Sequence, residues 1–201
     1  MLFEHQSRRP DVDPTATVAP TAVLSGDIRV GPGCRILHGA VLTAQGGPVT
    51  LGSRCIVMEN AVLRGTARHP LAVGEDVLIG PRAYLTGCVV EDASFLATGA
   101  TIFNGAVIGA RSEVRINGVV HLLTELDSDS TVPIGWVAVG RPAAILPPGA
   151  HEEIWERQEP LDFPREIFGV ERPGPGESIM PEVAERYGRY LALHDGDRRV
   201  D

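Results

Sequence analysis

Residues 73–119 read VGEDVL-IGPRAY-LTGCV-VEDASF-LATGAT-IFNGAV-IGARSE-VRINGV, a six-residue repeat in which each unit begins with an aliphatic side chain. The aliphatic positions include Val73, Ile79, Leu85, Val90, Ile102, Ile108, Val114 and Val120. Four residues further along stand smaller side chains, at Val77, Ala83, Ser94, Ala100, Ala106, Ser112 and Gly118. Two side chains in six therefore point inward, whereas a helix repeats every three to four residues and an amphipathic strand every two. A fixed short period of this kind indicates a solenoid whose turns bury their faces by stacking.

The same frame extends back nearly to the N-terminus, through Val18, Leu24, Val30, Ile36, Leu42, Leu51, Val57 and Leu63. Three hexads make one triangular coil, so residues eighteen apart should stack at about 4.8 Å. About seven coils fit before Pro147. The sequence therefore predicts an N-terminal arm over residues 1–16, a β-helix over 17–147 and a helical extension over 148–201.

The repeat is expected to be interrupted at 45–48, 67–70 and 122–131. Assigning the hexads to three faces in rotation places all three interruptions at one corner. Insertions gathered at one corner of a solenoid often build its binding edge. Loop capping or a subunit contact explains them equally well at this point.

Two helices are predicted after the repeat. The first spans Ala150–Gln158, with Ile154 and Trp155 on its apolar side. The second runs from Pro181 to about Leu193 and should bury Val183, Tyr187, Tyr190 and Leu191, which are spaced three and four apart. The intervening residues 160–178 are rich in proline and glycine and are expected to be extended.

Composition restricts the class of partner. The 201 residues are 43% hydrophobic and carry a formal net charge of -8, and such an acidic surface argues against nucleic acid or an anionic membrane as a partner. The first ten residues contain no apolar run typical of a signal peptide, and no stretch approaches the ~20 apolar residues of a membrane span. We therefore expect a cytoplasmic protein.

The three cysteines show no CxxC spacing, which argues against a disulfide framework or a thiolate zinc site. Cys34 and Cys55 occupy the small inward position one coil apart, and Cys88 lies in a turn. All three are interpreted as structural. A serine at position 34 is expected to be poorly partnered among aliphatic side chains, at a cost of about 1–3 kcal/mol.

Two stretches resemble the γ-class carbonic anhydrases: VLIGPRAYLTGCVVEDASFLATGATIFNGAVIG over 77–109 and AVGRPAAIL over 138–146. These enzymes are members of the hexapeptide-repeat superfamily, which also contains acyltransferases, and the resemblance covers roughly residues 18–146. It implies a mainly β fold, a left-handed parallel β-helix with C-terminal helices. It also implies a homotrimer in which three histidines bind zinc or iron across the subunit interface.

The positions that match the three histidines carry other residues here. The histidine of the family pattern V-G-H falls on Pro81, that of L-H-G-C on Thr86, and that of I-Q-D-x-x-V-x-H on Arg64. None of these side chains replaces an imidazole, because proline has no donor, threonine is a weak ligand and guanidinium stays protonated. No metal or other cofactor is therefore predicted. We expect the family scaffold without carbon dioxide hydration, because a metal is what lowers the pKa of the attacking water.

Glu59 matches the aspartate of the pattern I-Q-D-x-x-V-x-H, in which Arg64 takes the place of the histidine. Two interpretations of Glu59 and Arg64 stay open. They form a structural ion pair at the subunit boundary, or they mark a pocket for a small anion. Other histidines near the cleft are His69, in a loop, and His121, two coils beyond Thr86. Zinc is expected only if such histidines build an alternative site. Residues two coils apart are separated by about 9–10 Å, which is too far for them to bind one ion within a single chain.

The sequence and the resemblance together allow three hypotheses about function. The first is a metal-free homotrimer that acts as a binding or structural protein, or performs unknown chemistry in the cleft between subunits. Its partners are further copies of itself and a small anion or small-molecule ligand at the interface. The alternative is an acyl-CoA-dependent acyltransferase with His121 or His38 as the base. The third is a carbonic anhydrase with a rebuilt metal site. Whether the chain is an enzyme is left open.

Overall fold

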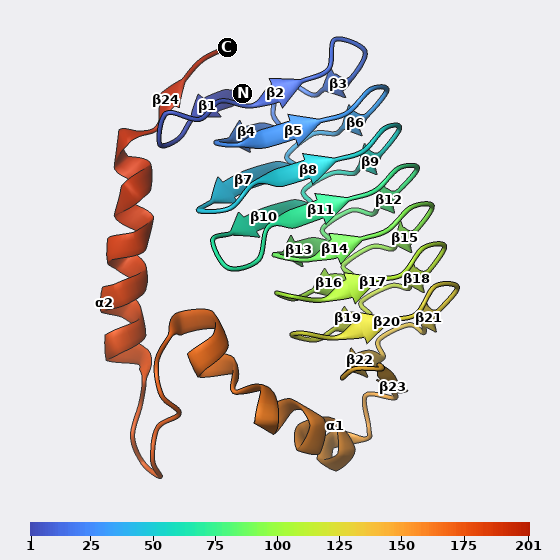
Figure 1. The fold of residues 1–201 in the computed structure, drawn as a ribbon, viewed down its shortest axis with the longest axis vertical. Helices are drawn as coiled ribbons and strands as arrows, with labels where there is room; N and C mark the ends of the chain where they lie inside the picture. The colour runs from blue at the N-terminus through green and yellow to red at the C-terminus, as the bar shows by residue number, and fades with distance from the viewer.

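The computed structural model describes residues 1–201 and has the predicted mainly β architecture, a left-handed parallel β-helix followed by a helical extension (Figure 1). The coils stack into three flat faces, one with ten strands and two with seven. Each short strand pairs with the equivalent strand of the coils before and after it. The apolar residues of each hexad are thereby buried only by stacking on neighbouring coils.

The first face contains, in spatial order, β23 (Ala144–Leu146), β22 (Val137–Val139), β19 (Val119–Val120), β16 (Thr101–Ile102), β13 (Tyr84–Thr86), β10 (Val62–Thr66), β7 (Val41–Gln45), β4 (Val23–Ser25), β1 (Leu2–Glu4) and β24 (Arg198–Arg199). The second contains β2 (Asp11–Val12), β5 (Ile28–Val30), β8 (Val49–Leu51), β11 (Leu71–Val73), β14 (Val89–Val90), β17 (Val107–Ile108) and β20 (Glu125–Leu126). The third contains β21 (Thr131–Val132), β18 (Glu113–Val114), β15 (Phe95–Leu96), β12 (Leu78–Ile79), β9 (Ile56–Val57), β6 (Arg35–Ile36) and β3 (Thr17–Val18).

The register of the strands explains why the repeat is visible in the sequence. Leu63 pairs with Leu42 on one side and Leu85 on the other, and all three are fully buried. Because successive side chains of a strand alternate in direction, the flanking residues of β10, Val62 and Arg64, point outward. The same alternation decides which residues of the first face are available to a binding site.

Two parts of the repeat differ from the sequence prediction. Residues 1–16, expected as an arm, carry β1 and β2, which pair with β4 and β5 as an additional coil. Residues 122–131, expected as a long loop, form regular structure with β20 and β21, and Leu126 is buried in the core. The loop prediction was wrong, because Leu126 continues the six-residue frame from Val120. The two remaining insertions, at 46–48 and 67–70, lie at the corner between the first and second faces.

The extension begins with α1 (His151–Gln158), in which Ile154 is buried and Trp155 is about half exposed. A 3-10 turn, η1 (Glu159–Leu161), and a π-helical turn, η2 (Pro164–Phe168), follow. The prediction of an extended chain was therefore wrong for this part. Pro164 occupies the first turn of η2, where the missing amide proton of proline costs little.

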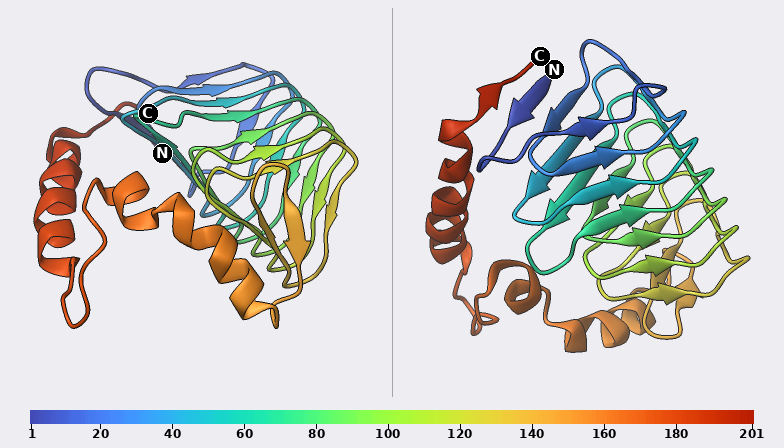
Figure 2. Two further views of the ribbon diagram at one scale, coloured as in Figure 1. Left: turned by 60° about the horizontal axis from the view of Figure 1, so that its bottom comes forward. Right: turned by 45° about the horizontal axis from the view of Figure 1, so that its top comes forward.

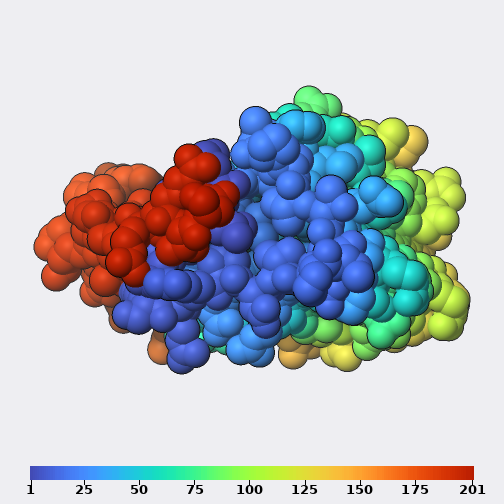
Figure 3. Space-filling model, turned by 90° about the horizontal axis from the view of Figure 1, so that it is seen from above, coloured from blue at the N-terminus to red at the C-terminus, as the bar shows by residue number.

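The second predicted helix is present as α2 (Met180–Leu191), which buries Val183 and leaves Leu191 exposed. It lies beside the solenoid and returns the chain to the N-terminal end, where the two termini are neighbours (Figure 2). There η3 (Ala192–Gly196) leads into β24, which pairs with β1 in antiparallel orientation. Figure 3 shows the last residues packed against the first ones. None of the helices has the length and apolar character needed to cross a bilayer.

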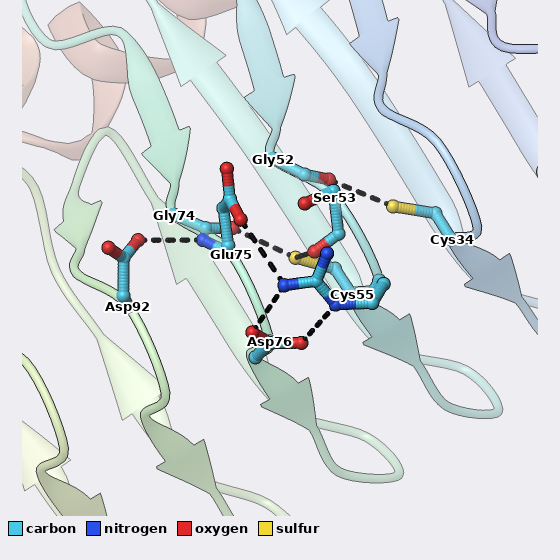
Figure 4. A network of polar contacts seen from close by, with 9 residues as sticks. Cys34, Gly52, Ser53, Cys55, Gly74, Glu75, Asp76 and Asp92 are labelled. Carbon is cyan, nitrogen blue, oxygen red and sulfur yellow. Dashed lines mark hydrogen bonds and ion pairs between the residues drawn. The ribbon is translucent and has the colours of Figure 1, made fainter.

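The inward position before four strands of the third face is occupied by thiol or hydroxyl side chains, Cys34, Cys55, Ser94 and Ser112. The thiols of Cys34 and Cys55 donate to the carbonyl oxygens of Gly52 and Gly74, both at 3.0 Å (Figure 4). No disulfide links the three cysteines, and burial raises the pKa of Cys88 to about 12. These thiols are structural, as the sequence indicated.

Candidate functional site

Arg64 and Thr86 are direct neighbours across β10 and β13. Both side chains point away from the core, since Leu63 and Leu85 beside them point inward. Phe103 and His121 follow β16 and β19 at the equivalent position of the next two coils. The first face therefore presents an outward row of one cation, one hydroxyl, one phenyl ring and one imidazole.

Three members of this row, Arg64, Thr86 and Phe103, border a cavity of about 580 Å³. Its floor is the first face, one wall is the 67–70 loop, and its cover is supplied by η2 and α2 of the extension. The polar lining includes Gln45, Arg64, Thr86 and Asn104, and the aromatic lining consists of Tyr84, Phe103, Phe163, Phe168, Tyr187 and Tyr190. The cavity has the mixed apolar and polar character of a small-molecule site.

Arg64 is held by the extension. Its Nη1 donates to the hydroxyl of Tyr187 at 3.0 Å, while its Nε is buried without a partner. The neighbouring Tyr190 hydroxyl donates to the carbonyl of Gln45, whose side chain is buried with its Nε2 unpartnered. A buried donor without an acceptor costs about 1–3 kcal/mol. Two such donors at one cavity indicate a place for a ligand that accepts hydrogen bonds.

Aromatic rings connect the floor of the cavity to its cover. Phe103 contacts Phe163 edge-to-face with centroids 6.2 Å apart, and Phe163 contacts Phe168 in the same way at 5.9 Å. Phe168 in turn meets Tyr187 at 6.1 Å. Edge-to-face pairs of this kind add about 0.5–1.5 kcal/mol beyond the area that they bury. They fix the position of the cover over Arg64.

The lining has an excess of positive charge. It contains four arginines, Arg64, Arg68, Arg165 and Arg186, and one carboxylate, Glu166. Arg68 lies 3.0 Å from Glu166, and His69 shares a hydrogen bond with it at 2.9 Å. Burial opposes ionisation of Glu166, but the bonds from His69 and Arg68 lower the pKa of its carboxyl below the usual value. With Glu166 engaged in this way, the cavity favours an anion.

Not all of the residues selected from the sequence meet here. Arg64, Thr86 and His69 line the cavity, whereas Pro81 lines a groove on the third face with Met58, Phe95, Ile116 and Ile134. Glu59 belongs to the turn between β9 and β10 and borders neither hollow. Within one subunit, Arg64 is therefore paired with Tyr187 and not with Glu59.

The other histidines do not complete a metal site at the cleft. His121 packs against Phe103 with centroids 5.8 Å apart, its Nδ1 is buried without a partner, and burial lowers its pKa. His38 is exposed and shares a hydrogen bond with Thr21. His69 is occupied by Glu166. The residues at the three family positions do not fit zinc either, since the guanidinium of Arg64 has no lone pair to offer.

The sequence did not reveal the contribution of the extension to this site. The spacing of Val183, Tyr187 and Tyr190 predicted a helix with one apolar face, but no local signal showed which surface that face covers. Glu166 and Phe168 were missed because η2 was expected to be extended. Gln45 had been assigned to an insertion, and only its burial identifies it as part of the cavity.

Comparisons of the sequence and of the fold with known proteins indicate the same protein family. No protein-family model matches the chain. The mitochondrial γ carbonic anhydrase 1 of Arabidopsis thaliana is 33% identical over 153 residues, which cover 73% of this chain and 54% of that protein. The chain thus spans about half the length of the plant relatives that it matches. The carnitine operon protein CaiE of Salmonella agona is 30% identical over 155 residues, 77% of this chain and 75% of that protein.

Among solved structures, UDP-N-acetylglucosamine acyltransferase LpxA of Bacteroides fragilis superposes with a TM-score of 0.52 over 89% of this chain and 91% of its own, at 14% identity. At that identity the similarity shows the fold alone. The repeat, the three-faced solenoid and the sequence relatives agree, and the chain belongs to the γ-carbonic-anhydrase-like family of hexapeptide-repeat, left-handed β-helix proteins.

Proposed function

We propose that this protein is a metal-free, homotrimeric member of its family that binds a small organic anion in the cavity beside Arg64. The observation that carries the proposal is the position of Arg64. Its guanidinium lies next to Thr86 in a covered cavity, has no carboxylate partner and keeps one buried donor unpartnered. Such a group fits a carboxylate, which accepts two hydrogen bonds from one guanidinium.

The rest of the lining indicates what the anion carries. Phe103, Phe163 and Phe168 line the same cavity and offer apolar ring surface to a ligand. A ligand with a carboxylate at one end and an aromatic or short aliphatic body at the other would satisfy both parts. Inorganic anions such as bicarbonate would leave the apolar part of the cavity uncovered.

The proposal of a trimer rests on the third face. Phe95, Ile116 and Ile134 are 40%, 45% and 62% exposed and line one groove with Pro81. A contiguous exposed apolar groove of this kind marks an interaction site. A second copy of this chain is the partner proposed, since Pro81 and Arg64 match residues that the family brings together across a subunit boundary.

Isothermal titration calorimetry with benzoate tests the anion site, with neutral benzamide as the matched ligand control. The protein should bind benzoate and not benzamide. Arg64→Met should reduce the affinity at least about tenfold, in line with the loss of a charge-assisted hydrogen bond worth about 1.5–3 kcal/mol. The exposed Arg157, which pairs only with Glu153 on α1, supplies the control variant Arg157→Met.

Equal binding of benzoate by wild type and Arg64→Met would contradict the proposed role of Arg64. A wild-type protein that binds neither benzoate nor hexanoate at millimolar concentration would contradict the anion site itself. The acyltransferase alternative receives no support from His121, which is covered by Phe103 and does not line the cavity. Saturable binding of acetyl-CoA with transfer of its acetyl group would restore that alternative.

A further inference from the structure

At the N-terminal end of the solenoid, two histidines that do not line the cavity converge on one carboxylate. His5 follows β1, and His194 and Asp197 lie at the end of the extension. Nδ1 of His5 lies 2.5 Å from Oδ1 of Asp197, and Nδ1 of His194 lies 2.9 Å from Oδ2. The three ligand atoms are all within 4.8 Å of one another. Residues from opposite ends of the chain thus meet at a single point.

The surroundings of this cluster are those of a built site. His5 is only 3% exposed, and its ring stacks on that of His194 with centroids 4.2 Å apart. The hydroxyl of Ser25, which is also buried, donates to Oδ2 of Asp197 at 3.2 Å. A ligating carboxylate is usually oriented by such an outer hydrogen bond. His194 remains partly exposed and leaves a path from solvent.

We propose that His5, His194 and Asp197 form a binding site for a divalent cation of the zinc type, which fastens the C-terminal extension to the first coil. Two imidazoles and one carboxylate suit zinc, cobalt or nickel better than magnesium or calcium, which prefer oxygen ligands alone. Three protein ligands with an open fourth position, filled by water, are an established arrangement for zinc.

The geometry requires only a small adjustment to accept the ion. Zinc bonds of about 2.0–2.2 Å in tetrahedral geometry separate the ligand atoms by about 3.4 Å. The Nδ1–Oδ distances, now 2.5 and 2.9 Å, would therefore each lengthen by less than about 1 Å. Each ring would turn the lone pair of Nδ1 to the ion and carry its proton on Nε2. No net proton is released when both imidazoles are neutral.

The site links two segments separated by 192 residues in the sequence. In the absence of the ion they are joined by hydrogen bonds to Asp197 and by the short pairing of β24 with β1. An ion bound there would restrict the same extension that supplies Tyr187 and Tyr190 to the cavity. The proposal does not depend on the anion site, because none of its ligands lines the cavity.

The test uses the full chain without a histidine tag, stripped with EDTA and titrated with ZnCl₂ by calorimetry and with CoCl₂ by visible absorption. One zinc should bind per chain, and cobalt should give the intense visible bands of a four-coordinate site. Loss of an outer-shell partner typically costs 10–100-fold in metal affinity. We expect Ser25→Ala to lower the affinity by about tenfold, and His194→Ala by at least about a hundredfold.

Two matched variants keep the result specific. His38→Ala and His151→Ala each remove an exposed histidine elsewhere, and both should bind zinc like the wild type. Absence of zinc and cobalt binding by the wild type at about 100 µM would overturn the proposal and leave a purely hydrogen-bonded cluster. Binding that survives His194→Ala but is lost in His69→Ala would overturn it too, by placing the ion at the cavity.

Discussion

At the scale of single residues, the inward column of the third face shows how the solenoid tolerates polar atoms in its core. Cys34 and Cys55 donate to carbonyls of the next coil, and Ser94 and Ser112 donate to the equivalent carbonyls of Gly109 and Asp127. The backbone therefore offers an acceptor at this position in every one of these coils. A hydroxyl here has a partner, contrary to the expectation from the sequence.

We accordingly expect Cys34→Ser to change the free energy of unfolding by no more than about 1 kcal/mol, because the new hydroxyl can donate to Gly52 as the thiol does. Leu63→Ala, a fully buried comparator, should cost about 2–5 kcal/mol through loss of buried area and formation of a cavity. Urea denaturation followed by circular dichroism gives both values. A loss at Cys34→Ser as large as that at Leu63→Ala would show that the carbonyl of Gly52 does not serve as an acceptor.

The positions that match the family's metal ligands could be located from the sequence because they fall within motifs that resemble those of the family. The six-residue repeat fixes these positions, because an aliphatic residue of the frame stands one or two residues before each of Arg64, Pro81 and Thr86. The partner of Arg64 was not identifiable, since Tyr187 lies 123 residues further along the chain. A contact of that kind depends on how the extension folds back, and no local pattern encodes it.

At the scale of elements, regular strands were easier to predict than their exceptions. The stretch at 122–131 was misassigned because Leu122, which is fully buried outside the six-residue frame, obscured the continuing period at Leu126. The prediction of an extended chain fails at η2 because Pro164 stands in its first turn, where proline is well accommodated. In both cases the local sequence is compatible with the observed structure, because Leu126 keeps the six-residue frame and proline is favoured in a first helical turn.

The extension is held to the solenoid by two carboxylates whose ionised forms are stabilised in the folded state. Burial opposes ionisation of Asp197 as it does of Glu166, but hydrogen bonds from His194 and His5 lower the pKa of Asp197. A lowered pKa contributes stability above the value of the unfolded chain, about 4, and this contribution is lost as the pH falls below it. Acid should therefore release the extension before the solenoid unfolds.

We expect pepsin in EDTA-containing buffer to cleave within residues 159–196 at pH 3, while circular dichroism still reports the β-solenoid. At neutral pH, Glu166→Gln should increase cleavage by trypsin after Arg186 and Arg189 on α2 several-fold, because the neutral amide cannot form an ion pair with Arg68 and the cover is held less firmly. The exposed Glu156 on α1, which makes no ion pair, provides Glu156→Gln as control. Equal resistance of all three proteins would argue against this role of Glu166.

At the scale of the whole molecule, the cavity on the first face and the apolar groove on the third face are the hollows that the proposed trimer would bring together. Ile134→Glu places a charge in the apolar groove of the third face and should shift the protein from three times its 21.4 kDa chain mass toward the monomer in light scattering. Val89→Glu is the control, since Val89 is also an exposed apolar residue, at 39%, but lies on the second face. A wild-type monomer at micromolar concentration would contradict the assembly.

We propose that the chain keeps the family's scaffold and carries an anion site in place of the family's metal centre. Stopped-flow hydration of carbon dioxide by the protein supplied with zinc, cobalt or ferrous iron tests it most directly. Because Arg64 puts a positive charge where a dication would sit, the rate should equal that of buffer, with every metal. A rate above buffer that a chelator abolishes, and that persists in His194→Ala, would contradict it by showing a working metal centre at the cleft.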